Sequence, residues 1–70
     1  METIAKLVKD ARIRAGLTQE QLSARTRVTQ SAISRVETGR EQPTLATLRR
    51  LTRALDVSAA EVVAALEGGA

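Results

Sequence analysis

Four polar side chains recur at helical spacing between residues 29 and 38, and their chemistry suits the reading of nucleic-acid bases. They are Gln30, Ser31, Ser34 and Arg35. A glutamine amide can form two hydrogen bonds with adenine, and an arginine guanidinium can form two with guanine. Small hydroxyls can meet bases, water or phosphate. The pattern predicts a face that contacts base edges in double-stranded DNA. The alternative for Gln30 is a solvated surface residue, and the alternative for Arg35 is contact to a phosphate alone.

Two short helices joined by a turn must position these side chains. Thr18 with Gln21 three residues later predicts a capping box at the start of the first helix, which is expected to end near Thr26. Thr29 is the N-cap candidate of the second helix. A short helix, a turn and a helix with a polar outer side form a helix-turn-helix motif, here residues 18–37, whose second helix enters the major groove.

Three further helices complete the expected fold, which is all-α. Apolar periodicity predicts a first helix from about Thr3 to Ala15, Thr44 caps a fourth, and Ser58 opens a fifth. We expect these five helices to form one compact domain over residues 1–70.

The expected core is aliphatic throughout. It comprises Ile4, Val8, Ala11, Leu17, Leu22, Val28, Ile33, Val36, Leu45, Leu48, Leu51, Leu55 and Val57. The fifth helix is too short to hide Val62, Val63 and Leu66 together. These three residues either complete the core or form a two-fold dimer contact.

Composition excludes several classes of function. The 70 residues contain no cysteine, histidine or aromatic side chain, so disulfide frameworks, Cys or His metal sites and imidazole bases are absent. The sequence also lacks a Gly-rich phosphate loop, a paired-carboxylate cleft and a nucleophile with a base at a suitable spacing. We therefore expect no enzyme activity, no metal and no cofactor.

Charge is distributed unevenly along the chain. The net charge is +3, but residues 1–55 hold all eleven cations and five of the eight anions, whereas residues 56–70 hold three anions and no cation. This asymmetry is typical of a polyanion-binding body with an end suited to a protein partner, and solvated surface cations are the alternative. No apolar run approaches membrane-spanning length and no signal segment opens the chain, so we expect a cytoplasmic protein with no membrane partner.

Several short motifs, in this order and spacing, carry a resemblance to a known family. They are Gly16-Leu17-Thr18-Gln19, Gln30-Ser31-Ala32-Ile33-Ser34, Glu37-Thr38-Gly39 and Pro43-Thr44-Leu45. Over about residues 4–66 the sequence resembles the Cro/cI-type (XRE family) helix-turn-helix domains of phage-repressor-like regulators. The resemblance implies a lambda-repressor-like fold with the motif at helices two and three. The sequence departs from the family pattern at Ser23, usually alanine, and at Arg27, usually glycine, where a left-handed backbone would be strained.

The resemblance also implies roles for individual residues. It supports base readout by the four polar residues of the helix expected at 29–38. It implies an ion pair between Arg12 and Glu37 that ties the first helix to the end of that helix. The expected phosphate contacts are Thr18, Gln19, Arg27, Thr29, Arg40 and Gln42, of which Thr18 and Gln19 lie at a helix N-terminus that favours anions. Simple capping is the alternative role of Thr18.

The function expected from these features is sequence-specific regulation of transcription, as a repressor that binds a pseudo-palindromic operator as a homodimer. A dimer places two such helices about 34 Å apart, one turn of DNA. The alternative is the antitoxin of a toxin–antitoxin pair, which binds a toxin protein and represses its own operon. Only residues 58–70 could supply the toxin-binding segment.

Overall fold

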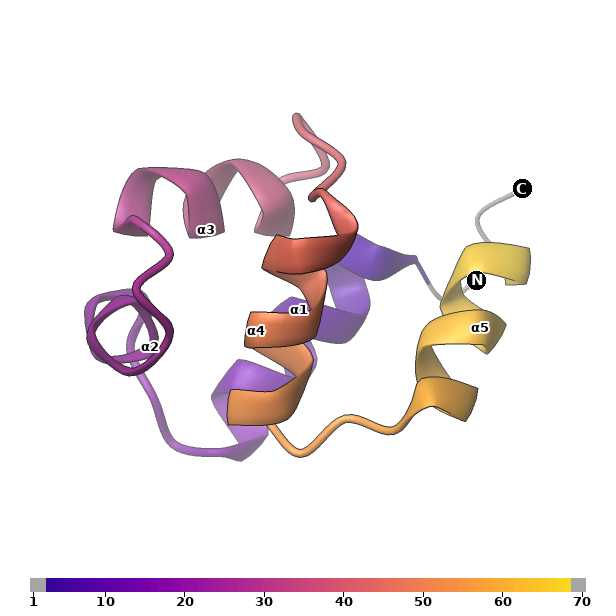
Figure 1. The fold of residues 1–70 in the computed structure, drawn as a ribbon, viewed down its shortest axis with the longest axis horizontal. Helices are drawn as coiled ribbons and strands as arrows, with labels where there is room; N and C mark the ends of the chain where they lie inside the picture. Colours follow the sequence, from indigo (N-terminus) through magenta and orange to yellow (C-terminus); the bar gives the residue numbers. More distant parts are fainter. Residues whose placement is uncertain (1–2, 69–70) are drawn as a thin grey trace.

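Five helices surround one aliphatic core in the computed structural model, which describes residues 3–68 (Figure 1). They are α1 (Ile4–Arg14), α2 (Gln19–Thr26), α3 (Gln30–Glu37), α4 (Leu45–Ala54) and α5 (Ala59–Gly68). In Figure 1, α1 and α4 lie in the middle of the molecule, with α2 and α3 on one side and α5 on the other. The described part of the chain contains no strand, and the expected all-α fold class is confirmed. No helix within residues 3–68 is long and apolar enough to cross a membrane.

Hydroxyl side chains define the helix starts, as the sequence pattern predicts for the second to the fifth helix. Thr3, Thr18, Thr29 and Thr44 each accept a hydrogen bond from the backbone N–H three residues later. At α5, Ser58 Oγ accepts from the Glu61 N–H, and the Glu61 carboxylate accepts from the Ser58 N–H at 2.8 Å. That N–H and the Ser58 hydroxyl hold the pKa of Glu61 below its ordinary value. The stabilisation from this carboxylate is therefore present at neutral pH and is lost as the pH falls through the lowered pKa.

The core confirms most of the expected aliphatic positions and corrects one. Leu45 is 73% exposed, so its assignment to the core was wrong. It is the first residue of α4 and lines a groove between α4 and α5, whereas Leu48, one turn later, is buried. Leu7 and Ala65 are buried although the sequence analysis did not include them. The small Ala65 side chain allows α5 to approach α1 closely.

The turn between α2 and α3 keeps a left-handed residue although no glycine is present. Arg27 has φ +62° and donates its N–H to the Ser23 carbonyl at 2.9 Å. The buried Thr26 hydroxyl donates to the Leu22 carbonyl at 2.8 Å and accepts from the Val28 N–H at 3.2 Å. Two side-chain bonds from one residue therefore hold the turn closed.

Replacing Arg27 with glycine should raise the thermal stability and weaken DNA binding. Relief of the left-handed strain is expected to contribute about 1 kcal/mol, which corresponds to roughly 4–8 °C in a domain of this size. Thermal unfolding followed by circular dichroism measures the first effect, and a duplex titration measures the second, which follows from the loss of a cation.

Asp56→Gly provides the matched control because Asp56 is the other non-glycine residue with a left-handed backbone among residues 3–68, at φ +55°. Aspartate tolerates this conformation better than arginine does, so a smaller rise in melting temperature is expected. This variant removes an anion and should not weaken DNA binding. A lower melting temperature for Arg27→Gly would contradict the strain argument.

Candidate nucleic-acid interface

The two sides of α3 have opposite character. Ile33 and Val36 are buried against the rest of the domain. The side chains predicted to read bases lie toward the other side, where Gln30, Ser31 and Arg35 are exposed and Ser34 is half-buried. Because α3 lies at the periphery of the molecule (Figure 1), its polar side is accessible to a large partner.

Two of these polar residues form a connected set with Glu41, which lies in the loop after α3. Arg35 Nη1 donates to Ser31 Oγ at 2.7 Å, one helical turn away, and Arg35 Nε donates to Glu41 Oε2 at 3.1 Å. Glu41 was absent from the predicted site because the loop that returns it to α3 is a tertiary feature. The spacing of Ser31 and Arg35 is the usual i, i+4 relation of neighbours on a helix, and it could have predicted their contact.

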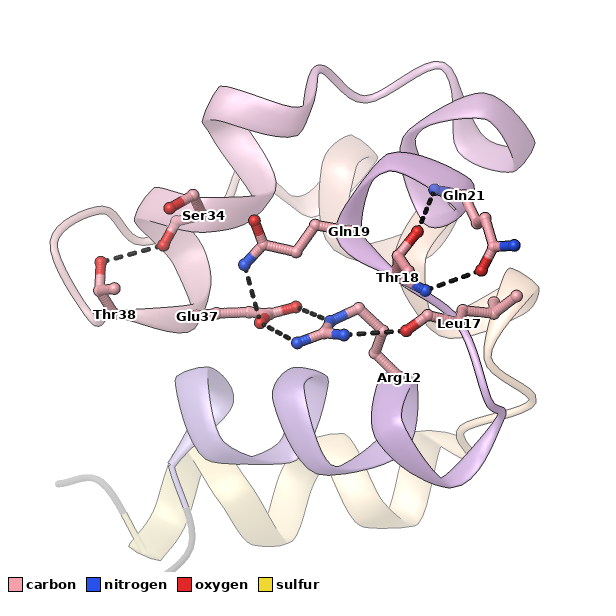
Figure 2. Close-up of polar contacts among 8 residues, drawn as sticks. All are labelled: Arg12, Leu17, Thr18, Gln19, Gln21, Ser34, Glu37 and Thr38. Atoms are coloured by element: carbon pink, nitrogen blue, oxygen red, sulfur yellow. Dashed lines mark hydrogen bonds and ion pairs between the residues drawn. The ribbon is translucent and has the colours of Figure 1, made fainter.

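The Arg12 guanidinium lies between α1 and α3 and pairs with the Glu37 carboxylate (Figure 2). Nε donates to Oε2 at 2.7 Å and Nη2 donates to Oε1 at 3.0 Å, which gives a two-pronged contact. The Arg12 side chain is 14% exposed and the Glu37 side chain 3%. The hydrogen bond to Glu37 raises the pKa of Arg12 above its usual value, against the opposing effect of burial. The pair fastens the C-terminal end of α3 to α1.

Gln19 adds a third group to this pair. Its Nε2 donates to Glu37 Oε1 at 3.2 Å, and Arg12 Nη1 donates to the Leu17 carbonyl at 2.8 Å (Figure 2). The network therefore joins α1, the loop before α2, the first residue of α2 and the last residue of α3. Sequence reasoning missed this role of Gln19 and placed it only among the phosphate contacts. The network sets the position of the whole helix-turn-helix motif on α1.

The other predicted phosphate contacts fall into three groups. Thr18 and Thr29 are exposed N-caps at the starts of α2 and α3, and Arg40 and Gln42 are exposed in the loop after α3. Arg27 is exposed at the C-terminal end of α2. It lines a shallow hollow of about 440 Å³ with three further arginines, and these are Arg25, Arg50 and Arg53.

The candidate dimer residues of α5 do not face one common surface. Val62 is partly buried and packs against the core. Val63 is 50% exposed and lines, with Val62, the apolar groove of about 300 Å³ between α4 and α5. Leu66 is 49% exposed and lines a separate hollow beside Ile4. No group of three or more His, Cys, Asp or Glu residues within residues 3–68 is arranged to hold a metal ion.

Comparison with known proteins adds three findings. A helix-turn-helix family model matches residues 8–62. The chain is 48% identical over 48 residues to the uncharacterized HTH-type transcriptional regulator y4dJ of Sinorhizobium fredii, a match that covers 69% of this chain and 62% of that protein. Its fold matches the crystal structure of a point mutant of the restriction–modification controller protein C.Esp1396I with a TM-score of 0.77 and 26% identity, over 87% of this chain and 79% of the other. The chain thus spans about three fifths of the curated relative.

Proposed function

Because the chain belongs to the XRE-type helix-turn-helix family of DNA-binding transcriptional regulators, we propose that it represses transcription by reading an operator major groove with α3. The observation that carries the proposal is the division of α3 into a buried apolar side and an accessible side with Gln30, Ser31 and Arg35. An α-helix fits the major groove, where each base pair presents a distinct pattern of donors and acceptors. Gln30, in the first turn, is the residue we assign to an adenine.

Phosphate contacts would fix the position of α3 in the groove. Thr18 and Thr29 lie at helix N-termini, where backbone amides and the helix dipole favour an anion. Arg40 and Gln42 are exposed in the loop after α3, and we assign them to the DNA backbone as well. Gln19 retains one amide hydrogen beyond its bond to Glu37 and can also reach a phosphate. Arg27, beside three other arginines, supports the approach to DNA through its charge.

The proposed assembly is a homodimer on a pseudo-palindromic operator. Two features favour α5 and the groove beside it as the contact: Leu45 and Val63 are exposed large apolar residues, and both line the groove. A second copy that covered them would remove this apolar surface from water. Binding to two half-sites requires that the two α3 helices of the dimer lie about one helical turn of DNA apart.

A fluorescence-anisotropy titration tests the proposal. The labelled duplexes are the DNA upstream of the gene and a scrambled version of it, each at several salt concentrations. We expect tighter binding to the upstream duplex and an affinity that falls steeply with salt, with a slope that reports the number of phosphate contacts. Selection from a random duplex library identifies the preferred sequence when the operator lies elsewhere in the genome. Failure to enrich any sequence would contradict the proposal.

Gln30→Ala should relax the choice of base at one position of the selected operator. Loss of a two-bond contact to adenine is expected to reduce discrimination by about 1–3 kcal/mol, which is roughly 5- to 150-fold. Gln42→Ala is the matched control, since it removes the same side chain from a proposed phosphate contact and should weaken all sequences alike. Uniform weakening by both variants would argue that Gln30 does not read a base.

A further inference from the structure

The Arg35 guanidinium is held from two sides. Its Nε donates to Glu41 Oε2 at 3.1 Å and its Nη1 donates to Ser31 Oγ at 2.7 Å. Within residues 3–68 the structure gives this guanidinium no third acceptor. Three hydrogens remain, one on Nη1 and two on Nη2, and these two nitrogens form the outer edge of the group. This outer edge is the two-donor fork that matches guanine O6 and N7.

A backbone turn after α3 brings Glu41 close to Arg35. Gly39 adopts φ +74°, which ends α3 and reverses the chain. The Arg40 and Glu41 N–H groups then both donate to the Arg35 carbonyl, at 2.9 Å and 3.3 Å. Arg35 therefore contacts Glu41 twice, through its guanidinium and through its backbone carbonyl. The pair follows from the geometry of the turn as well as from the attraction of two opposite charges.

The Arg35–Glu41 ion pair contributes little to the stability of the fold. The side chains of Arg35 and Glu41 are 47% and 49% exposed, and exposed ion pairs contribute little to folding. A carboxylate on a surface that approaches DNA also repels phosphates. It would oppose a role of Arg35 as a simple phosphate contact. It agrees with a role in which the guanidinium is oriented toward a base, because ordering the side chain before binding reduces the cost of ordering it on the DNA.

We propose that Glu41 is a positioning residue that directs Arg35 to a guanine and lowers the affinity for non-operator DNA. The proposal rests on the proposed function, since it concerns the same reading surface. It makes Glu41 a determinant of specificity although the Glu41 side chain itself contacts no base.

The test is binding-site selection followed by titration of the selected and scrambled duplexes. The proteins are the wild type, Arg35→Ala, Glu41→Gln and Glu41→Asp. Arg35→Ala should lose the preference for G·C at one base pair and so identify that position. Glu41→Gln should reduce the preference there about three- to tenfold, the range set by the cost of ordering one long side chain, and should bind the scrambled duplex more tightly. Glu41→Asp keeps the charge but shortens the reach, so it should lose the preference without that gain.

Asp10→Asn is the matched control because it breaks an exposed ion pair of the same kind, Lys6–Asp10 at 2.8 Å on α1. It should leave the preference at the Arg35-dependent base pair unchanged. Wild-type preference in Glu41→Gln at that position would overturn the inference, and so would uniform weakening of all duplexes by Arg35→Ala. In both cases selection by the wild type would still support the proposed function. If the wild type enriches no sequence, the proposed function fails and the inference fails with it.

Discussion

Glu37→Gln is expected to lower the free energy of unfolding by about 3–5 kcal/mol, the cost of removing one partner from a buried ion pair. The Glu37 carboxylate accepts hydrogen bonds from Arg12 Nε, Arg12 Nη2 and Gln19 Nε2. A glutamine amide has one acceptor oxygen and one donor nitrogen, so it leaves the Arg12 charge uncompensated. A domain of this length has a total stability on the order of 4–10 kcal/mol. The substitution should therefore remove a large share of it.

Urea and thermal unfolding followed by circular dichroism measure this loss. Asp10→Asn is again the control, since an exposed pair contributes only about 0.2–1 kcal/mol. The double variant Arg12→Met with Glu37→Met should recover much of the lost stability, because replacing both charges with apolar groups leaves no buried charge. Undiminished stability in Glu37→Gln would show that the pair does not fasten α3 to α1.

Local chemistry explains why the helix starts were predictable from the sequence. Each cap depends on a hydroxyl and a backbone amide three residues later, so a short window such as Thr18 to Gln21 contains all the information. The family pattern has glycine at the position of Arg27, and this pointed to a left-handed backbone there. Asp56, which also has a left-handed backbone, has no such pattern to mark it.

Long-range geometry explains what the sequence could not predict. Leu45 belongs to an apolar repeat with Leu48 and Leu51, but the repeat does not reveal that the Leu45 side chain at the start of α4 is exposed in the fold. The bond from Gln19 to Glu37 joins residues 18 positions apart, and only the packing of α2 against α3 brings them together. The candidate reading residues could be named from helical spacing, whereas the contact of Glu41 with Arg35 required the turn at Gly39.

Val63→Glu is expected to weaken operator binding about 100-fold or more without unfolding the domain. If the α4–α5 groove forms the dimer contact, each copy brings Val63 to it, and the dimer would then bury two carboxylates in place of two apolar side chains. Linking two binding modules increases affinity by about 10²–10⁴ over one module, and this gain is what the variant should lose.

Sedimentation equilibrium and titration of full and half operators separate dimerisation from DNA contact. Val63→Glu should sediment as a monomer, bind the full operator weakly and retain the wild-type affinity for a half operator, because α3 is unchanged. Because Val63 is 50% exposed in a single copy, its replacement should cost the monomer little stability. Ile13→Glu is the control, since Ile13 is 57% exposed on α1 and does not line the groove. A dimeric Val63→Glu protein with full operator affinity would show that the dimer contact lies elsewhere, because a contact at the groove could not accommodate a charge at its rim.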